Sequence, residues 1–291
     1  AATIRATIRR GGLFTPSWGR RRALPEYLLL IERASAHDEQ ARVGEALAEC
    51  LKASDIGVAP YYFQGDARTC RPYTFEGKAR ATLRPAPFAP GVTLGELAAR
   101  HPEHRLLIFG DGAEFFDPFT GAAQRWLEEF AHWPERALLM SAAPRAGDYR
   151  TEVLRAHEFL VLPTDEAGFE VLTAWLNTGL NFEEQAEARR VATASLPAFI
   201  AERPKRWLEA VTPPVAEIAP LLQHLKTYLG DAGWLWLRAC AVYPQLAWEL
   251  TLYLGARLVG QYSEQAAAVL RLVRLPWFRY GVMPDWLRGE L

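Results

Sequence analysis

The fold is decided by residues 26–51, which read EYLLLIERASAHDEQARVGEALAECL. Residues 27–31 are continuously apolar, which predicts a strand that is buried on both faces of a sheet. Ser35 and Asp38 follow, and both are residue types that begin helices. Apolar side chains then recur at helical spacing from residue 41 to residue 51. The stretch therefore predicts a buried strand, a short turn and an amphipathic helix.

The same alternation continues to about residue 177. Further buried strands are expected at 56–63, 105–110, 136–140 and 158–163, and helices at 122–132, 149–157 and 167–176. Thr93 and Glu96 form the pattern of a capping box that opens another helix. Residues 70–92 hold four prolines and no clear period, which predicts a long loop. Strands that alternate with helices imply right-handed crossovers, so we expect residues 25–177 to form a three-layer α/β domain with a mostly parallel five-stranded sheet.

Strand signals almost vanish after residue 178. Asn181 with Glu184 begins a charged helix, and amphipathic segments follow at 213–229, 231–242, 246–258 and 263–275. Six tryptophans in this half are suited to packing between helices or against a partner. We expect residues 178–291 to form an all-helical domain, with a winged-helix-like arrangement as the alternative.

The charge is unevenly distributed along the chain. Its 33 basic and 34 acidic residues give a formal net charge of −1, in a composition that excludes a disordered chain. Residues 1–24 carry six arginines and no acid, which leaves the remainder with 27 basic and 34 acidic residues, or −7. Glycines and prolines favour an arm or linker here. Binding of nucleic acid or an acidic partner is therefore allowed only at this arm, through Arg9, Arg10, Arg20, Arg21 and Arg22.

Several common activities and locations lack their sequence signature. There is no phosphate-binding Gly-x-x-x-x-Gly-Lys-Ser/Thr, no His-Glu-x-x-His and no Gly-x-Ser-x-Gly. Accordingly, no cofactor, metal ligand or catalytic residue is predicted by motif. Three widely spaced cysteines indicate no disulfide framework and favour the reducing cytoplasm. No uncharged apolar run reaches 18 residues, so a membrane span is not expected.

Four polar residues are candidates for binding a ligand. In open parallel sheets, ligands bind beyond the carboxyl ends of the strands. Ser35 and Asp38 follow the first predicted strand, and Asp111 and Asp117 follow the third. Carboxylates gathered there could hold a hard cation. They could equally be turn and helix-cap residues, and the sequence leaves both readings open.

The run LLIFGDG at 106–112 resembles the strand and Asp-Gly element of von Willebrand factor A domains. In that family the first strand ends in Asp-x-Ser-x-Ser, and the Asp-Gly aspartate supports a divalent-metal adhesion site. The matching stretch here is Glu32-Arg33-Ala34-Ser35-Ala36, with alanine at both serine positions. The resemblance therefore implies the fold without that metal site.

Residues 28–51, with the strand expected at 58–63, resemble the opening of TIR domains. Members of that family that cleave NAD use a glutamate on a later helix, often near a tryptophan. Trp126 lies close in sequence to Glu128 and Glu129. This resemblance implies a TIR-like NAD hydrolase with Glu128 or Glu129 as the catalytic residue.

Four longer segments are similar to the N-terminal region of certain bacterial multidomain proteins. These proteins carry a formylglycine-generating-enzyme-like or C-type-lectin-like domain at the C-terminus, sometimes varied by diversity-generating retroelements. The helical half also resembles helical or winged-helix modules beside signalling ATPases, through 237–258 and 272–288. The segments of the first resemblance are 11–35, 61–72, 104–121 and 130–139.

Three functional hypotheses follow, and we favour the first. The chain is a non-enzymatic signalling or protein-interaction module of a larger bacterial multidomain or conflict system. The second hypothesis is the TIR-like hydrolase, and the third is binding of nucleic acid through the arginine arm. Protein partners are expected under the first hypothesis, whereas the sequence leaves the oligomeric state and the partner open.

Overall fold

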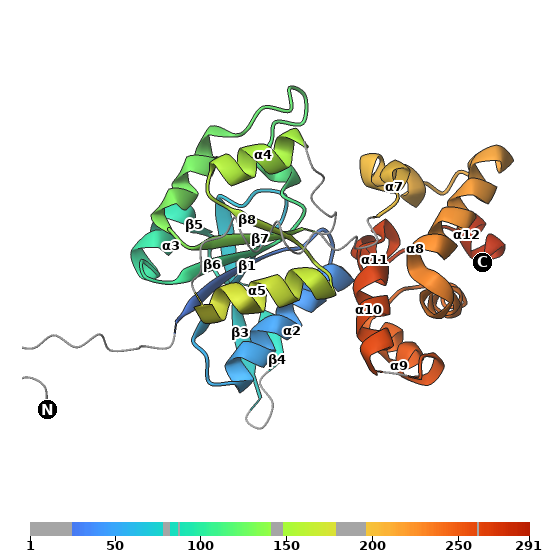
Figure 1. The fold of residues 1–291 in the computed structure, drawn as a ribbon, viewed down its shortest axis with the longest axis horizontal. Helices are drawn as coiled ribbons and strands as arrows, with labels where there is room; N and C mark the ends of the chain where they lie inside the picture. Colours follow the sequence, from blue (N-terminus) through green and yellow to red (C-terminus); the bar gives the residue numbers. More distant parts are fainter. Residues whose placement is uncertain (1–24, 78–81, 87, 141–147, 179–195, 261) are drawn as a thin grey trace, which may run out of the picture.

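The computed structural model describes residues 25–77, 82–86, 88–140, 148–178, 196–260 and 262–291. The arginine arm and the helix expected from Asn181 lie outside these residues. A sheet covered by helices forms the first part of the chain, and a group of helices lies beside it (Figure 1). In the second group, α10 and α11 are the helices nearest to α2 and α5 of the first.

One mixed sheet of eight strands forms the centre of the α/β part. Its order is β4-β3-β2-β1-β6-β7-β8, and β5 pairs with β3. The strands β2, β1, β6, β7 and β8 run parallel to one another, which confirms the α/β class and all five predicted strands. The bounds are β1 (Tyr27–Glu32), β2 (Val58–Phe63), β3 (Thr69–Glu76), β4 (Thr82–Pro85), β5 (Val92–Thr93), β6 (Arg105–Phe109), β7 (Arg136–Met140) and β8 (Leu160–Pro163).

The prediction of a loop at residues 70–92 is wrong, because β3, β4 and β5 lie there. All three extend the sheet by antiparallel pairing. Pro72 sits inside β3 opposite Tyr61 of β2, yet only two residue pairs join these strands. A short ladder tolerates a proline, which lacks the N–H that a longer one would need. The mostly parallel five-stranded sheet is thus the parallel half of a larger mixed sheet.

The two faces of the sheet are covered by different helices. Leu28 and Leu30 of β1 point to one face, where α3 (Leu94–Arg100), α4 (Tyr149–Ala156) and the 3₁₀ segment η2 (Arg125–His132) pack. Leu29 and Ile31 point to the other face, against α2 (Glu39–Ala53) and α5 (Glu166–Thr178). This alternation is the period-two geometry of a strand with apolar layers on both sides.

The sequence signals for helix starts are confirmed at two places. Asp38 caps α2, and its Oδ1 accepts hydrogen bonds from the backbone N–H groups of Gln40 and Ala41. Thr93 and Glu96 form the expected capping box at α3. The helix expected at 122–132 is shorter and takes the 3₁₀ form of η2.

The second part of the chain is helical and has its own apolar core. Residues 196–260 and 262–291 contain no strand, so the β-hairpin of a winged helix is absent from them. Gly230, with φ 70° and ψ 177°, kinks α8 at the break expected between 229 and 231. No helix among the described residues has the length and apolarity that crossing a bilayer requires. The elements are α7 (Ala198–Glu202), η3 (Pro204–Leu208), α8 (Val215–Ala241), α9 (Trp248–Leu258), α10 (Tyr262–Leu272), α11 (Pro276–Tyr280) and α12 (Asp285–Glu290).

Buried tryptophans fix the helices of this part against one another. The Nε1 of Trp236 on α8 donates to the backbone oxygen of Thr251 on α9 at 2.8 Å. The Nε1 of Trp277 on α11 donates to the backbone oxygen of Trp207 in η3 at 2.8 Å. Each ring therefore contributes apolar burial and satisfies its N–H. The expectation that tryptophans pack between helices is met at these two positions.

Replacing Gly255 by alanine should destabilise the helical part. A Cβ at this position would lie 2.0 Å from the Trp236 ring, so α9 and α8 would have to separate. We expect the free energy of unfolding in urea to fall by about 1–3 kcal/mol. The matched control is Gly289→Ala on α12, where the Cβ meets nothing within 4 Å. Equal losses in both variants would contradict the close packing of Trp236 on α9.

Candidate functional site

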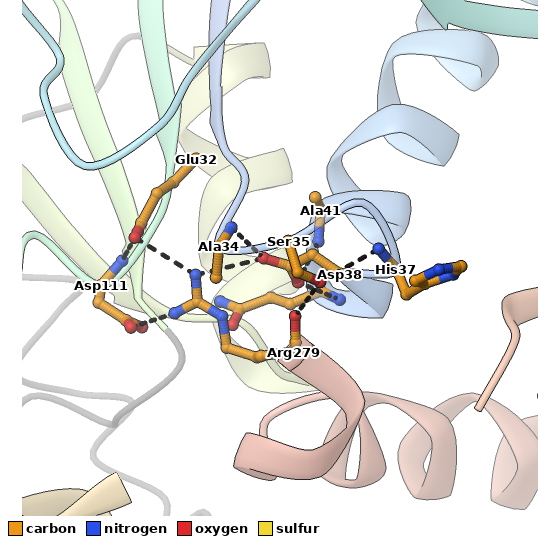
Figure 2. Close-up of polar contacts among 9 residues, drawn as sticks. Glu32, Ala34, Ser35, His37, Asp38, Ala41, Asp111 and Arg279 are labelled. Atoms are coloured by element: carbon orange, nitrogen blue, oxygen red, sulfur yellow. Dashed lines mark hydrogen bonds and ion pairs between the residues drawn. The ribbon is translucent and has the colours of Figure 1, made fainter. Parts of the chain in front are cut away.

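Three of the four predicted ligand-binding residues meet at the carboxyl ends of β1 and β6. Ser35 and Asp38 lie in the turn after β1, and Asp111 lies directly after β6. Figure 2 shows all three beside Arg279, a residue of α11 in the helical part. Asp117, the fourth, lies in a separate turn, where its Oδ1 accepts from the backbone N–H groups of Phe119 and Thr120. Three of the residues predicted from the sequence therefore do lie together at the strand ends. The residue that contacts them there is Arg279 of the same chain.

The Arg279 guanidinium is held by three carboxylates. Its Nη1 bonds the Oδ2 of Asp111, and its Nη2 lies 3.3 Å from Glu32 Oε1 and 3.4 Å from Asp38 Oδ2. The Arg279 side chain is only 7% exposed. In addition, Ser35 Oγ donates to the backbone oxygen of Arg279 at 2.8 Å. Both the side chain and the backbone of Arg279 are thus fixed to the α/β part.

Local backbone geometry brings these acids together. Asp38 uses Oδ1 to cap α2, while its Oδ2 accepts from the N–H of Ala34 at 2.8 Å and faces Arg279. The N–H of Asp111 donates to Glu32 Oε2 at 2.7 Å, which links the ends of β1 and β6. Gly110 precedes Asp111 and has no side chain. A Cβ at this position would lie only 2.7 Å from Glu32 Oε2, so any other residue here would displace the Glu32 carboxylate. Helix capping by Asp38 and the bond between Asp111 and Glu32 therefore orient these carboxylates in addition to their ion pairs with Arg279.

A fourth acid, Glu114 in η1 (Ala113–Phe115), completes what we term the strand-end cluster: Glu32, Asp38, Asp111, Glu114 and Arg279. Burial raises the pKa of the Glu114 carboxyl well above its usual range, and the neighbouring Glu32 charge adds to the rise. Burial likewise raises the pKa of Glu32 and of Asp38, although the Arg279 charge opposes both shifts. These carboxyls are hard to ionise together because water is excluded from them.

The same carboxylates keep the arginine charged. Burial by itself would lower the pKa of the Arg279 guanidinium, but Asp111, Asp38 and Glu32 outweigh it and the pKa lies above its ordinary value. A buried cation that is matched by several acids is costly to remove, because each remaining acid loses its counter-charge. The cluster is therefore an electrostatic joint between the α/β part and the helical part.

Three further contacts cross the same junction. Thr251 Oγ1 donates to Glu39 Oε1 at 2.9 Å, and the side chains of Gln245 and His37 lie 3.0 Å apart at their nitrogen atoms. Arg274 pairs with Asp165 across 3.6 Å. Burial raises the pKa of Glu39 to about 8, with the Thr251 hydrogen bond acting in the opposite direction. Polar contacts therefore flank the strand-end cluster on the α2 and α5 sides.

Sequence reasoning missed Arg279 and Glu39 as members of this junction, whereas Glu114 lies in the segment after β6 that the strand-end rule picks out. Arg279 lies in the otherwise apolar and aromatic run PWFRYG, 241 positions after Asp38. A charged residue inside such a run is a signal for a buried ion pair, since isolated charges are almost never buried. The sequence alone could not name its partners.

The two glutamates proposed for the TIR-like hydrolase are not members of the strand-end cluster. Glu128 and Glu129 are exposed on η2, while the nearby Trp126 ring packs edge-to-face against Phe115 and Phe130. Their proposed catalytic role stays a prediction. The arm residues Arg9, Arg10, Arg20, Arg21 and Arg22 lie outside the described residues.

Neither a metal-binding group nor the pocket found in the helical part coincides with the strand ends in the described ranges. No group of three or more His, Cys, Asp or Glu side chains there or elsewhere in the described ranges is arranged to hold a metal. A pocket of about 490 Å³ lies in the helical part, between α7, η3 and α8, with Phe199, Trp207 and His224 in its lining. The strand-end acids do not line it.

Comparison with known proteins gives no assignment for this chain: no family model, curated protein or solved structure matches it.

Replacing Arg279 by alanine should weaken the junction strongly. Removing one partner of a buried ion pair leaves uncompensated charges, so we expect the free energy of unfolding to fall by about 3–5 kcal/mol. Urea unfolding at neutral pH measures this loss. Arg155→Ala is the control, because its pair with Glu152 is exposed and should cost less than about 1 kcal/mol. A loss as small for Arg279→Ala would contradict the joint.

Replacing Glu39 by glutamine should change how stability depends on pH. The folded pKa of Glu39 is about 8, above the ordinary value of 4.5, so folding favours the neutral form. Its stabilising contribution is complete below about pH 4.5 and is lost as the pH rises through about 8. Glu39→Gln should therefore lose less stability than the wild-type chain between pH 5 and 9 (roughly the range of this titration).

Urea unfolding across that pH range measures the difference between the two chains. Glu290→Gln, at the end of α12 and exposed, is the matched control and should follow the wild-type curve. Parallel curves for wild type and Glu39→Gln would show that Glu39 is not buried against Thr251.

Proposed function

We propose that the chain is a non-enzymatic signalling or protein-interaction module in which the α/β part and the helical part act as one coupled unit. The observation that carries this proposal is the insertion of Arg279 at the strand ends. Ligands of open α/β sheets bind at that edge. In this chain, a side chain from the helical part lies there and contacts Glu32, Asp38 and Asp111.

The surface of the helical part supports an interaction role. Large apolar side chains are exposed on and beside α8 and α9, and several are more than half exposed. Such side chains offer apolar contact area to a protein partner. Three of them are Val215, Val242 and Tyr253, at 82%, 73% and 57% exposure. The setting in a larger bacterial multidomain or conflict system rests on the resemblances of the sequence.

A direct test against the alternative is to incubate the purified 291-residue chain with NAD. We expect NAD to remain intact by proton NMR, because Glu128 and Glu129 are exposed on η2 and the nearby Trp126 ring packs against Phe115 and Phe130. Turnover that disappears in Glu128→Gln or Glu129→Gln would establish the TIR-like hydrolase instead. Glu103→Gln, an exposed glutamate outside η2, serves as the control variant.

A further inference from the structure

The strand-end cluster has the chemistry of a slot for arginine. A guanidinium carries five N–H donors in a planar fork and is always charged, so it suits several carboxylates at once. Here the fork meets Asp111 through Nη1 and both Glu32 and Asp38 through Nη2. A lysine ammonium is a point charge and would not match three acids spread around a plane.

Arg279 fills this slot incompletely. Its own Nε is buried without a hydrogen-bond partner among the described residues. The same holds for Glu114 Oε1 and for both amide atoms of Gln40, whose side chain lies in the first turn of α2. Glu114 belongs to the cluster, because its charge interacts with Glu32, Asp111 and Arg279. With Arg279 in place, buried polar atoms of Arg279 itself, of Glu114 and of Gln40 therefore have no hydrogen bond among the described residues.

The mismatch follows from how Arg279 is supported. It sits on the five-residue helix α11, which begins at Pro276 and ends at Gly281 with φ 70°. Gly281 is pressed against His37, where a Cβ would lie 2.4 Å from the His37 Cβ. The backbone of α11 is therefore held by packing and by the Ser35 hydrogen bond, and in this position the Arg279 side chain leaves its Nε without a partner among the described residues.

One side of the slot remains accessible. The Asp111 side chain is 35% exposed, whereas those of Asp38 and Arg279 are nearly buried. A side chain that enters past Asp111 would approach the acids from outside the chain. Because it would not be tied to α11, it could orient its fork toward Glu32, Asp38 and Asp111 independently of that helix.

We propose that the strand-end cluster is a recognition slot for an arginine side chain of a protein partner, and that Arg279 is its displaceable intramolecular occupant. This inference rests on the interaction role proposed above. Binding of the partner arginine releases α11 from the α/β part, so occupancy of the slot is transmitted to the helical part. The two arginines compete because the fork of one excludes the other.

The test uses the whole chain with N-acetyl-arginine-amide as the probe, followed by hydrogen exchange of the backbone amides in α11. We expect exchange in α11 to accelerate saturably with the arginine probe. N-acetyl-lysine-amide, which has the same charge, should have a much smaller effect, and the uncharged citrulline analogue none. Equal effects of the lysine and arginine probes would show that any cation weakens the ion pairs of Arg279 by screening. That result would overturn the proposal of an arginine-specific slot.

A second experiment removes the Arg279 side chain from the slot by substitution. Arg279→Ala should bind the arginine probe about tenfold more tightly than wild type if the slot is open about a tenth of the time in wild type. Asp38→Asn added to this variant should abolish binding, since asparagine still caps α2 but lacks the charge. If Arg279→Ala does not fold, Arg279→Gln takes its place, and if neither folds the exchange result alone decides. A folded variant without saturable binding overturns the proposal.

The outcomes separate the slot from the proposed function. If the arginine probe does not bind and NAD stays intact, the slot proposal is wrong and the proposed interaction role stands. NAD turnover that depends on Glu128 or Glu129 would remove the interaction role, whether or not arginine binds.

Discussion

A guanidinium buried among carboxylates is the constraint on which the arrangement of this chain depends. Arg279 crosses from the helical part to the strand ends and is held by Glu32, Asp38 and Asp111. Buried ion pairs add little net stability compared with an apolar substitute, but breaking one is expensive. The cluster therefore specifies which face of the helical part meets the sheet more than it increases stability.

Several polar atoms at this junction are buried without being satisfied. Glu39, Gln40, Glu114 and Arg279 all bury side-chain atoms that have no hydrogen-bond partner among the described residues. Burying each such atom without a hydrogen bond lowers the free energy of unfolding by about 1–3 kcal/mol, because the lost contact with water is not replaced. An open state would recover hydration of these groups. A partner that satisfies them can shift the balance, because a ligand acts through its differential affinity for two states.

Local patterns were sufficient to predict the parallel half of the fold. The apolar run of β1 fixed a strand with two buried faces, and Asp38 and the Thr93–Glu96 pair fixed two helix starts. The antiparallel extension was missed because β3 contains Pro72 and depends on its pairing with β2, β4 and β5. Strand identity there is decided by the neighbour and not by the strand's own residues.

The candidate site divides in the same way. Ser35, Asp38 and Asp111 could be predicted because the ends of parallel strands share one edge. Arg279 could not be assigned to that edge, since the contact joins residues 241 positions apart. Asp117 was included by proximity in sequence to Asp111, yet its side chain is used within its own turn.

The most direct measurement of the central claim is a double-mutant cycle between Asp38 and Arg279. Asp38→Asn removes the charge and keeps an N-cap residue, and Arg279→Gln removes the cation with a similar side-chain length. Urea unfolding of the wild type, both single variants and the double variant gives their coupling energy. The account predicts a coupling of at least about 1 kcal/mol, as for residues in one ion-pair network. Losses that add within about 0.3–0.5 kcal/mol would contradict it.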